Sequence, residues 1–250
     1  MARFENKYLV PKARMSELRD FLRSYINVDD FASRCVDNTY TVRSIYYDTS
    51  RLRYYNEKIE GLQFRKKLRI RGYDCEQDDS VIFLEIKRKR NSLISKNRAP
   101  VYFKNLSQLL ETNDIETYAG LQKGKANSLA NARKFFYHLN RHSLKPVVKV
   151  IYDREAYFYK FNRSLRITFD KNLRGSLFCK SDDLYTEVST NYPLPEHFIL
   201  EIKGRGSYPQ WLQYIIGEMA FPLKALSKYT ICIDSHRNSE PPIPFYNRVQ

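Results

Sequence analysis

The sequence contains the tetrapeptide Leu-Glu-Ile-Lys twice, at residues 84–87 and 200–203. In an extended strand, successive side chains point to opposite faces, so each copy places a glutamate and a lysine on one face and two apolar residues on the other. A half-buried strand with a solvated polar face explains either copy taken alone. The chemical question is whether the charged faces are turned toward water or toward a ligand.

Cationic side chains dominate the polar faces when the other strand-like segments are divided by the same alternation. Dry burial of many like charges is prohibitive, because even a relaxed, unpaired internal ion costs several kcal/mol. The pattern therefore predicts a closed sheet that packs its apolar side outward on helices and encloses a wet, cationic channel. The polar faces comprise Arg3, Glu5 and Lys7; Lys67, Arg69 and Arg71; Glu85 and Lys87; Tyr152 and Arg154; Arg166, Thr168 and Asp170; Glu201 and Lys203; and Lys228.

A channel of this kind is suited to a linear polyanion with regularly spaced phosphates. Arginine grips phosphate through two parallel hydrogen bonds, and lysine acts on it as a point charge. A carboxylate among these cations is out of place for anion binding alone. Its presence is explained if it holds a divalent cation that the phosphates also ligate.

The elements that must position these residues are mostly strands, identified by β-branched and aromatic residues that alternate with polar ones. Helical periodicity occurs between them, and the basic segment 90–98 is predicted to be a loop. The expected fold is α+β and mostly antiparallel β, a closed eight-stranded tunnel barrel with helices packed outside. One domain is expected over residues 1–237, followed by a Pro-rich tail over 238–250. The predicted strands are 3–10, 39–48, 64–73, 81–89, 146–159, 164–170, 197–203 and 227–234, and the predicted helices are 15–26, 126–140 and 208–220.

The composition also favours an anionic partner. The 250 residues include 43 Lys and Arg against 28 Asp and Glu, which gives a formal net charge of +15. Glycine is scarce, and neither the P-loop pattern nor the dinucleotide-binding glycine pattern occurs. Four dispersed cysteines, at positions 35, 75, 179 and 232, are expected to be free thiols of a reducing compartment. No apolar run approaches the length of a membrane span, so a soluble, cytoplasmic protein is expected.

Eight segments in this order resemble the polyphosphate polymerase domain of the VTC (vacuolar transporter chaperone) family, which belongs to the triphosphate tunnel metalloenzymes. The resemblance extends over about residues 3 to 235, and it is the order of the segments that makes it specific. Its segments are RFENKYLV, SIYYDT, KLRIRGY, FLEIKRK followed by Lys96 and Arg98, VIYDREAY, LRITFD, FILEIKGRG and LSKYT.

The resemblance implies a reaction and roles for particular residues. The γ-phosphoryl group of ATP would move to the end of a growing polyphosphate chain that threads through a basic tunnel. Glu201 corresponds to the metal-binding glutamate of the family, for Mn²⁺ or Mg²⁺, and Tyr152 and Ser227 would donate hydroxyl hydrogen bonds. The cationic residues implied to hold the phosphates are Lys7, Arg69, Arg71, Lys87, Arg154, Arg166, Lys203 and Lys228.

The residues present are consistent with this chemistry. Phosphoryl transfer needs in-line positioning, a metal across the phosphates and cations over the equatorial oxygens, with little covalent help from the protein. Catalysis is accordingly expected from Arg69, Arg71, Lys87, Arg154, Arg166 and Glu201. The acceptor phosphate is already an anion, so no general base is required. His138 and His142 stand four residues apart on a predicted helix, but nothing nearby completes a metal ligand set.

Two departures bear on the choice of reaction. Hydrolytic members of the superfamily carry Glu-x-Glu-x-Lys on the first strand, whereas this chain has Arg3-x-Glu5-x-Lys7. Arginine at the first acidic position argues against efficient metal-dependent hydrolysis, and Glu5 is expected to pair with a neighbouring cation. The sequence lacks the SPX module and membrane helices that accompany fungal versions, so coupling to a membrane would need a membrane-protein partner.

Two alternatives stay open beside the polymerase. The first is a metal-dependent hydrolase of tripolyphosphate or nucleoside triphosphates, which would use the same tunnel with water as the acceptor. The second is a non-catalytic binder of polyphosphate or nucleic acid, supported by the charge and the 35 Tyr and Phe residues. Most of these aromatic residues fall on apolar strand faces or helices, where a core role is expected. ATP, triphosphate and polyphosphate are therefore the expected ligands, without sequence-specific nucleic acid binding.

Overall fold

The computed structural model describes residues 3–74, 76, 77, 79–91, 93–119, 126–177, 179–187 and 189–237, with only the backbone of Ala126. The predicted Pro-rich tail over 238–250 lies outside these residues, as does Cys75. Cys35, Cys179 and Cys232 form no disulfide with one another. No helix in the described ranges is long and apolar enough to cross a membrane.

The chain divides into two compact units, each built from separate stretches of sequence. Unit 1 comprises Met1–Val42, Ile151–Leu173 and Leu194–Ser227, and unit 2 comprises Arg43–Val150, Arg174–Pro193 and Lys228–Gln250, as far as these ranges are described. Each unit has its own hydrophobic core.

Hydrogen-bonded strands follow the order β1-β9-β8-β7-β3-β4-β5-β6, with β2 paired to β7. The registered pairs are antiparallel, so the predicted mostly antiparallel α+β fold is confirmed. Among the strands that the structure describes, β1 and β6 at the ends of this order are not paired with each other, so the predicted closed barrel is not confirmed. The strands are β1 (Arg3–Pro11), β2 (Ile26–Val28), β3 (Thr39–Asp48), β4 (Phe64–Tyr73), β5 (Val81–Arg90), β6 (Leu93–Tyr102), β7 (Lys145–Tyr159), β8 (Asn162–Leu177) and β9 (His197–Arg205).

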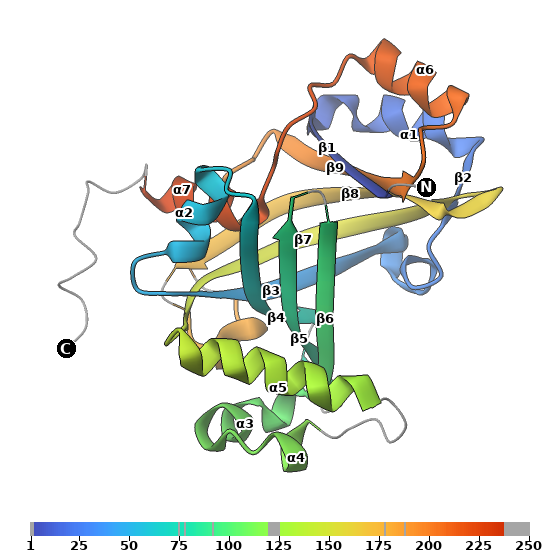
Figure 1. Ribbon diagram of the computed structural model, residues 1–250. Helices are drawn as coiled ribbons and strands as arrows, with labels where there is room; N and C mark the ends of the chain where they lie inside the picture. The colour runs from blue at the N-terminus through green and yellow to red at the C-terminus, as the bar shows by residue number, and fades with distance from the viewer. Residues whose placement is uncertain are drawn as a thin grey trace. The chain divides into compact units, whose positions relative to one another are not determined.

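Unit 1 packs two amphipathic helices on the apolar face of its strands. Helix α1 (Met15–Arg23) contributes Leu18 and Leu22 to the core, and α6 (Gln210–Met219) contributes Leu212, Ile215 and Met219. Figure 1 shows both helices beside β1 and β9. The strand residues of this core alternate with the charged residues of the opposite face, as predicted. They are Tyr8, Val10, Leu165, Ile167, Phe169, Phe198, Leu200 and Ile202.

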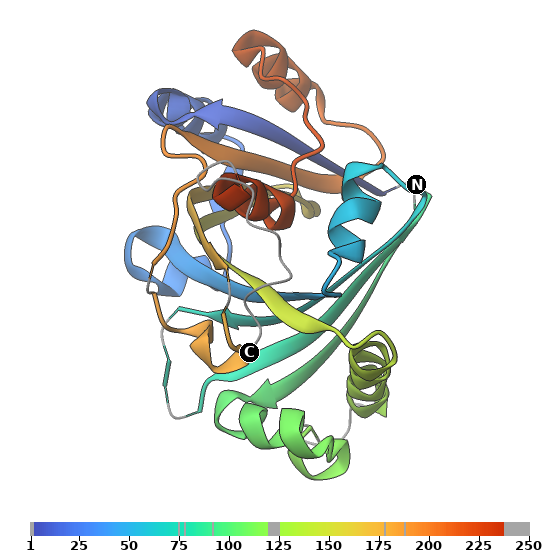
Figure 2. The same cartoon turned by 90° about the vertical axis from the view of Figure 1, so that its left-hand side faces the viewer.

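In unit 2, the long strands β4, β5 and β6 run side by side (Figure 2), and helices of the same unit cover their apolar face. Leu68, Ile70 and Ile86 are fully buried there. Helix α5 packs on β5 and β6 and places Phe135 in the same core. The helices of unit 2 are α2 (Arg53–Ile59), α3 (Leu106–Thr112), α4 (Ile115–Tyr118), α5 (Ala126–Arg141) and α7 (Lys228–Arg237). Short 3-10 turns occur in both units, at Lys12–Arg14, Ala32–Arg34, Val36–Asn38, Phe103–Asn105 and Ser181–Leu184.

Two predicted elements are wrong. The segment 227–234 was expected to be a strand but forms helix α7, which buries Tyr229, Cys232 and Ile233 at helical spacing. The segment 90–98 was expected to be a loop, but most of it belongs to β6, whose first residues are exposed. An exposed strand lacks the apolar alternation by which strands are recognised, because neither face is covered.

Replacing Phe135 by alanine tests the core of unit 2. Loss of this fully buried ring should lower the free energy of unfolding by about 3–5 kcal/mol, through lost transfer energy and a residual cavity. Phe161→Ala is the matched control, because that ring is 84% exposed and its loss should stay within about 0.5 kcal/mol. Urea unfolding followed by circular dichroism measures both, and equal losses would contradict the assignment of the core.

Candidate functional site

In unit 2, one buried carboxylate lies among four cationic side chains. Glu85 on β5 stands between Arg69 on β4 and Arg98 on β6 in the strand register. Its oxygens lie 2.7 Å from Arg69 Nη2, 2.5 Å from Lys96 Nζ and 3.3 Å from Arg98 Nε. Arg71 Nε lies 4.0 Å away. Among the contacts of the described residues, one carboxylate therefore lies among four cations, and these contacts sum to an excess of positive charge.

The guanidinium groups of this cluster are held in fixed orientations. Arg69 donates from Nε to Glu85 at 2.8 Å and from Nη1 to the hydroxyl oxygen of Tyr46 at 2.7 Å. Arg71 donates from Nε to the Ser44 hydroxyl at 3.2 Å. A planar guanidinium anchored in this way presents its donors in a defined direction, which suits bidentate recognition of phosphate.

The crowding of charge shifts the pKa values of Glu85 and Lys96. Burial alone would raise the pKa of Glu85, but Arg69, Arg71 and Lys96 outweigh it and hold that pKa well below its ordinary value. Burial lowers the pKa of Lys96 to about 8; Glu85 opposes this shift, and the two arginines add to it. Lys96 therefore titrates close to neutral pH, where an anionic ligand would favour its charged form.

In unit 1, Arg154 is neutralised by carboxylates. Its Nε lies 2.6 Å from Asp170 Oδ1 and its Nη2 lies 2.8 Å from Asp170 Oδ2. Glu201 Oε2 lies 3.6 Å from the same Nη2. Burial would lower the pKa of Arg154, but Asp170, Tyr152 and Glu201 raise it well above its ordinary value. The pair fixes a fully charged guanidinium on the polar face of β7.

Glu201 on β9 lies among lysine side chains. Its Oε1 is 2.9 Å from Lys203 Nζ and 3.9 Å from Lys7 Nζ, and Lys7 also lies 3.4 Å from Glu5. The expected pairing of Glu5 with a cation is confirmed. Opposite Glu201 in the register stands Thr168, whose buried Oγ1 has no hydrogen-bond partner among the described residues. The polar face of unit 1 carries Lys7, Arg154, Arg166 and Lys203 against Glu5, Asp29, Asp170 and Glu201.

Glu201 is the carboxylate that the family resemblance implies to bind a metal ion. Over the described ranges, no group of three or more His, Cys, Asp or Glu side chains is arranged to hold a metal. Mg²⁺ often binds through one or two carboxylates together with substrate phosphates and waters. Glu201 is paired with flexible lysine side chains, and the unpartnered Thr168 hydroxyl lies on the neighbouring strand. These donors fit a metal carried with phosphates, and not a closed protein cage.

The predicted site residues fall into two groups, one in each unit. Tyr152 lies beneath the Arg154 guanidinium, with its ring centroid 5.2 Å from the guanidinium carbon. Arg166 lies 3.5 Å from Asp29 and stands opposite Lys203 in the register. Unit 1 contains Lys7, Tyr152, Arg154, Arg166, Glu201, Lys203 and Ser227, and unit 2 contains Arg69, Arg71, Lys87 and Lys228.

Several residues of these groups were not predicted as site residues. Arg98 and Lys96 occur in a segment expected to be a loop, although the family resemblance included them. Asp170 shares a strand face with Arg166, but no sequence signal indicates that it binds Arg154. Nothing in the sequence indicates that Tyr46 is bound to Arg69, because that contact depends on the packing of β3 beside β4.

The paired histidines of α5 lie in positive surroundings. The rings of His138 and His142 are 5.9 Å apart and nearly parallel, and Nδ1 of His138 is buried without a partner within the described structure. Burial, followed by the charges of Lys66, His142 and Arg88, lowers the pKa of His138 to about 4. These nearby cations oppose a metal ion at this position.

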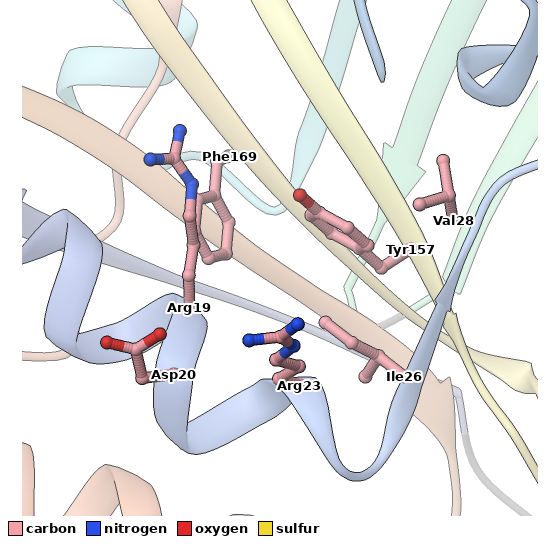
Figure 3. A pocket seen from close by; sticks show the side chains of 7 residues that line it. All are labelled: Arg19, Asp20, Arg23, Ile26, Val28, Tyr157 and Phe169. Atoms are coloured by element: carbon pink, nitrogen blue, oxygen red, sulfur yellow. The ribbon is translucent and has the colours of Figure 1, made fainter. Parts of the chain in front are cut away.

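A pocket of about 210 Å³ in unit 1 contains none of the predicted site residues (Figure 3). Arginines 19 and 23 reach over it from α1, while Tyr157 and Phe169 line it from β7 and β8. Phe169 belongs to the apolar face of its strand, opposite the charged face that carries Asp170. Its lining residues are Arg19, Asp20, Arg23, Ile26, Val28, Tyr157 and Phe169.

Comparison with known proteins identifies the family. The family model of the VTC domain matches residues 2–237. The chain belongs to the VTC domain family. A curated relative, the Vacuolar transporter chaperone complex subunit 4 of Schizosaccharomyces pombe, is 24% identical over 244 residues. The match covers 84% of this VTC chain and 34% of the relative, so the chain spans about a third of the length of that relative.

Two solved structures align with nearly the whole VTC chain at low scores. The PH1819 protein from Pyrococcus horikoshii OT3 has a TM-score of 0.47 and 14% identity, covering 93% of this chain and 99% of its own. The putative adenylyl cyclase HpAC1 from Hippeastrum, described as having a dominant triphosphatase activity, has a TM-score of 0.49 and 13% identity, covering 98% and 99%. At these scores neither likeness supports an argument about this VTC chain.

Replacing Glu85 by glutamine tests the charge balance of the unit 2 group. The variant leaves four cations without their carboxylate, so the free energy of unfolding should fall by about 3 kcal/mol, the low end for a broken buried pair. The low end applies because Lys96 and Arg98 are partly exposed. Glu116→Gln is the control, since Glu116 pairs with Arg133 at the surface and its loss should cost less than about 1 kcal/mol. Equal losses in urea unfolding would contradict the assignment.

The lowered pKa of Lys96 predicts a pH-dependent affinity for polyanions. As pH rises through about 8, Lys96 loses its proton and its attraction for phosphate, so affinity for a long polyphosphate should fall by at most about tenfold between pH 7 and 9. Lys96→Arg stays charged over this range and should flatten that part of the profile. Fluorescence anisotropy with labelled polyphosphate measures both proteins, and identical profiles would refute the role of Lys96.

Proposed function

We propose that this VTC-domain chain is an ATP-dependent polyphosphate polymerase, which transfers the γ-phosphoryl group of ATP to a growing polyphosphate chain. The observation that carries the proposal is the group of four cations around Glu85 in unit 2. Its excess positive charge calls for an anionic ligand, and membership of the VTC domain family supports phosphate as that anion.

The proposed residue roles follow the resemblance and the two groups of contacts. Arg69 and Arg71 would bind phosphoryl oxygens from fixed orientations, and Arg154 would act as a fully charged guanidinium held by Asp170. Catalytic roles are proposed for Arg69, Arg71, Lys87, Arg154, Arg166 and Glu201. Binding of ATP and polyphosphate is proposed for Lys7, Arg69, Arg71, Lys87, Tyr152, Arg154, Arg166, Lys203, Ser227 and Lys228.

The chain would catalyse transfer by positioning and by stabilising charge. A phosphoryl group in transfer carries negative charge on its equatorial oxygens, and preorganised guanidinium and ammonium groups stabilise that charge without reorganisation. The terminal phosphate of the polymer is already a nucleophilic anion, so no side chain has to remove a proton from it. Mn²⁺ or Mg²⁺ at Glu201 would supply further charge neutralisation on the phosphates.

A membrane-protein partner for the polymer is also proposed. The relative from S. pombe is by name a subunit of a vacuolar transporter chaperone complex. A soluble polymerase would release its product where it is made, so delivery across a membrane requires a second protein. The cytoplasmic location proposed for the catalytic chain is consistent with ATP as the phosphoryl donor.

Incubation of the purified protein with ATP and Mn²⁺ or Mg²⁺ tests the activity. The expected product is a long polyphosphate ladder on a polyacrylamide gel, together with ADP. Orthophosphate as the sole phosphate product would instead indicate a triphosphate hydrolase. Absence of turnover combined with tight polyphosphate binding would indicate a non-catalytic binder. Either the hydrolase result or the binder result would refute the polymerase.

Replacing Glu201 by alanine tests the metal assignment. The variant should lose at least about a hundredfold in turnover, because the proposed metal ligand is removed. The midpoint of thermal unfolding should fall, because the buried Glu201 pairs with Arg154, Lys203 and Lys7, so turnover is measured well below the unfolding transition of the variant. Glu116→Gln, at the exposed pair with Arg133, should retain full activity. Survival of activity in Glu201→Ala, with the same dependence on metal concentration, would show that the metal is held elsewhere.

A further inference from the structure

Tyr46 on β3 lies in the cationic group of unit 2, although neither the charge pattern nor the family resemblance gave it a role. Its side chain is 7% exposed. Its hydroxyl oxygen accepts a hydrogen bond from Arg69 Nη1 at 2.7 Å, and the Arg69 guanidinium carbon lies 5.5 Å from its ring centroid. Tyr46 therefore contacts the arginine that binds Glu85, at the point where excess positive charge collects.

The hydroxyl proton of Tyr46 has no acceptor among the described residues. A tyrosine hydroxyl can donate one hydrogen bond as well as accept, and Tyr46 is seen only to accept. Tyr229 donates to Asp48 and Tyr157 donates to Glu155, whereas the buried Tyr54 hydroxyl has no partner among the described residues. A donor left without an acceptor in a mostly buried position is unfavourable. An acceptor from outside the protein, such as a phosphoryl oxygen, would satisfy it.

The surroundings make Tyr46 a stronger donor than an ordinary phenol. Burial alone would raise its pKa, but the positive charges of Arg69, Arg71 and Lys228 outweigh burial and bring the pKa below its ordinary value. A more acidic hydroxyl donates a stronger hydrogen bond to an anion. The same charges would attract the anion toward the hydroxyl.

The ring of Tyr46 is held by a second tyrosine that is itself fixed. Tyr229 of α7 stacks on it with ring centroids 4.9 Å apart and an interplanar angle of 27°. The Tyr229 hydroxyl donates to Asp48 at 2.5 Å, and Asp48 is fully buried and accepts from the backbone N–H groups of Tyr54 and Tyr55 at 2.9 Å. The ring of Tyr229 on α7 thus supports Tyr46 directly, and the backbone at the start of α2 supports it through Asp48.

We propose that Tyr46 is a phosphate-binding residue, whose hydroxyl donates to a phosphoryl oxygen of the triphosphate or polyphosphate bound by Arg69. By accepting from Arg69 Nη1, the same hydroxyl also fixes the plane of that guanidinium opposite its contact with Glu85. Arg69 and Tyr46 form a two-donor clamp for one phosphoryl group. The inference rests on the proposed function, because it takes the ligand of the cationic group to be a phosphate chain.

Tyr46→Phe is the test, with tripolyphosphate binding measured by calorimetry at fixed salt and without turnover. Loss of a hydrogen bond to a charged ligand should weaken the affinity by about tenfold to a hundredfold. The thermal midpoint of the ligand-free protein should fall modestly, because Arg69 Nη1 loses the hydroxyl oxygen that accepts its hydrogen bond at 2.7 Å. Tyr47→Phe is the matched control: Tyr47 lies on the opposite face of β3, pairs with Ser181 at 2.6 Å, and should leave the affinity unchanged.

A double substitution separates direct contact from mere support of Arg69. If Tyr46 contacts phosphate, Tyr46→Phe should weaken tripolyphosphate binding further in an Arg69→Ala background; no further loss there would overturn direct contact. Unchanged affinity in the single variant, with a wild-type protein that binds tripolyphosphate, would overturn the inference and leave the proposed function standing. A wild-type protein that does not bind tripolyphosphate would overturn both.

Discussion

Repulsion among the cations around Glu85 is the constraint on which the proposed chemistry depends. Two unit charges about 4 Å apart repel by about 4 kcal/mol at an effective dielectric constant near 20. Salt screens this repulsion only in part, because each of the four cations lies within 4.0 Å of Glu85 and the screening length at physiological ionic strength is about 8 Å. Among the contacts of the described residues, one carboxylate faces the four charges of Arg69, Arg71, Lys96 and Arg98. A polyanion that bridges several of these groups relieves the repulsion and is bound tightly for that reason.

The apolar faces of the same strands make this arrangement tolerable for folding. Leu68, Ile70 and Ile86 are fully buried on the face opposite Arg69 and Lys87. Each strand therefore contributes packing energy on one face and electrostatic repulsion on the other. Unit 1 uses the same alternation but balances its cations with four carboxylates.

Sequence alternation predicted most strands but could not predict their partners. The limits of β3 and β4 agree with the predicted ranges. Helix α7 was missed because Tyr229, Thr230, Ile231 and Ile233 have strand propensity, and packing against the core decided for a helix. Long-range contacts carry no local signal at all: the pairing of Arg154 with Asp170 and of Arg69 with Tyr46 depends on which strands become neighbours. The need for glycine at position 204 also depends on a long-range contact. A Cβ at this position would lie only 2.5 Å from Cζ of the Phe4 ring.

Stability in the presence of tripolyphosphate measures the central constraint most directly. Chemical unfolding of the intact chain is followed with tripolyphosphate and, in parallel, with sodium chloride at matched ionic strength. Relief of repulsion by a bound polyanion predicts a gain of about 2.7 kcal/mol in the free energy of unfolding when the ligand is at a hundred times its Kd, with little gain from the chloride. Equal gains from both salts would show that the cationic face has no particular affinity for phosphate chains, and would contradict the proposed chemistry.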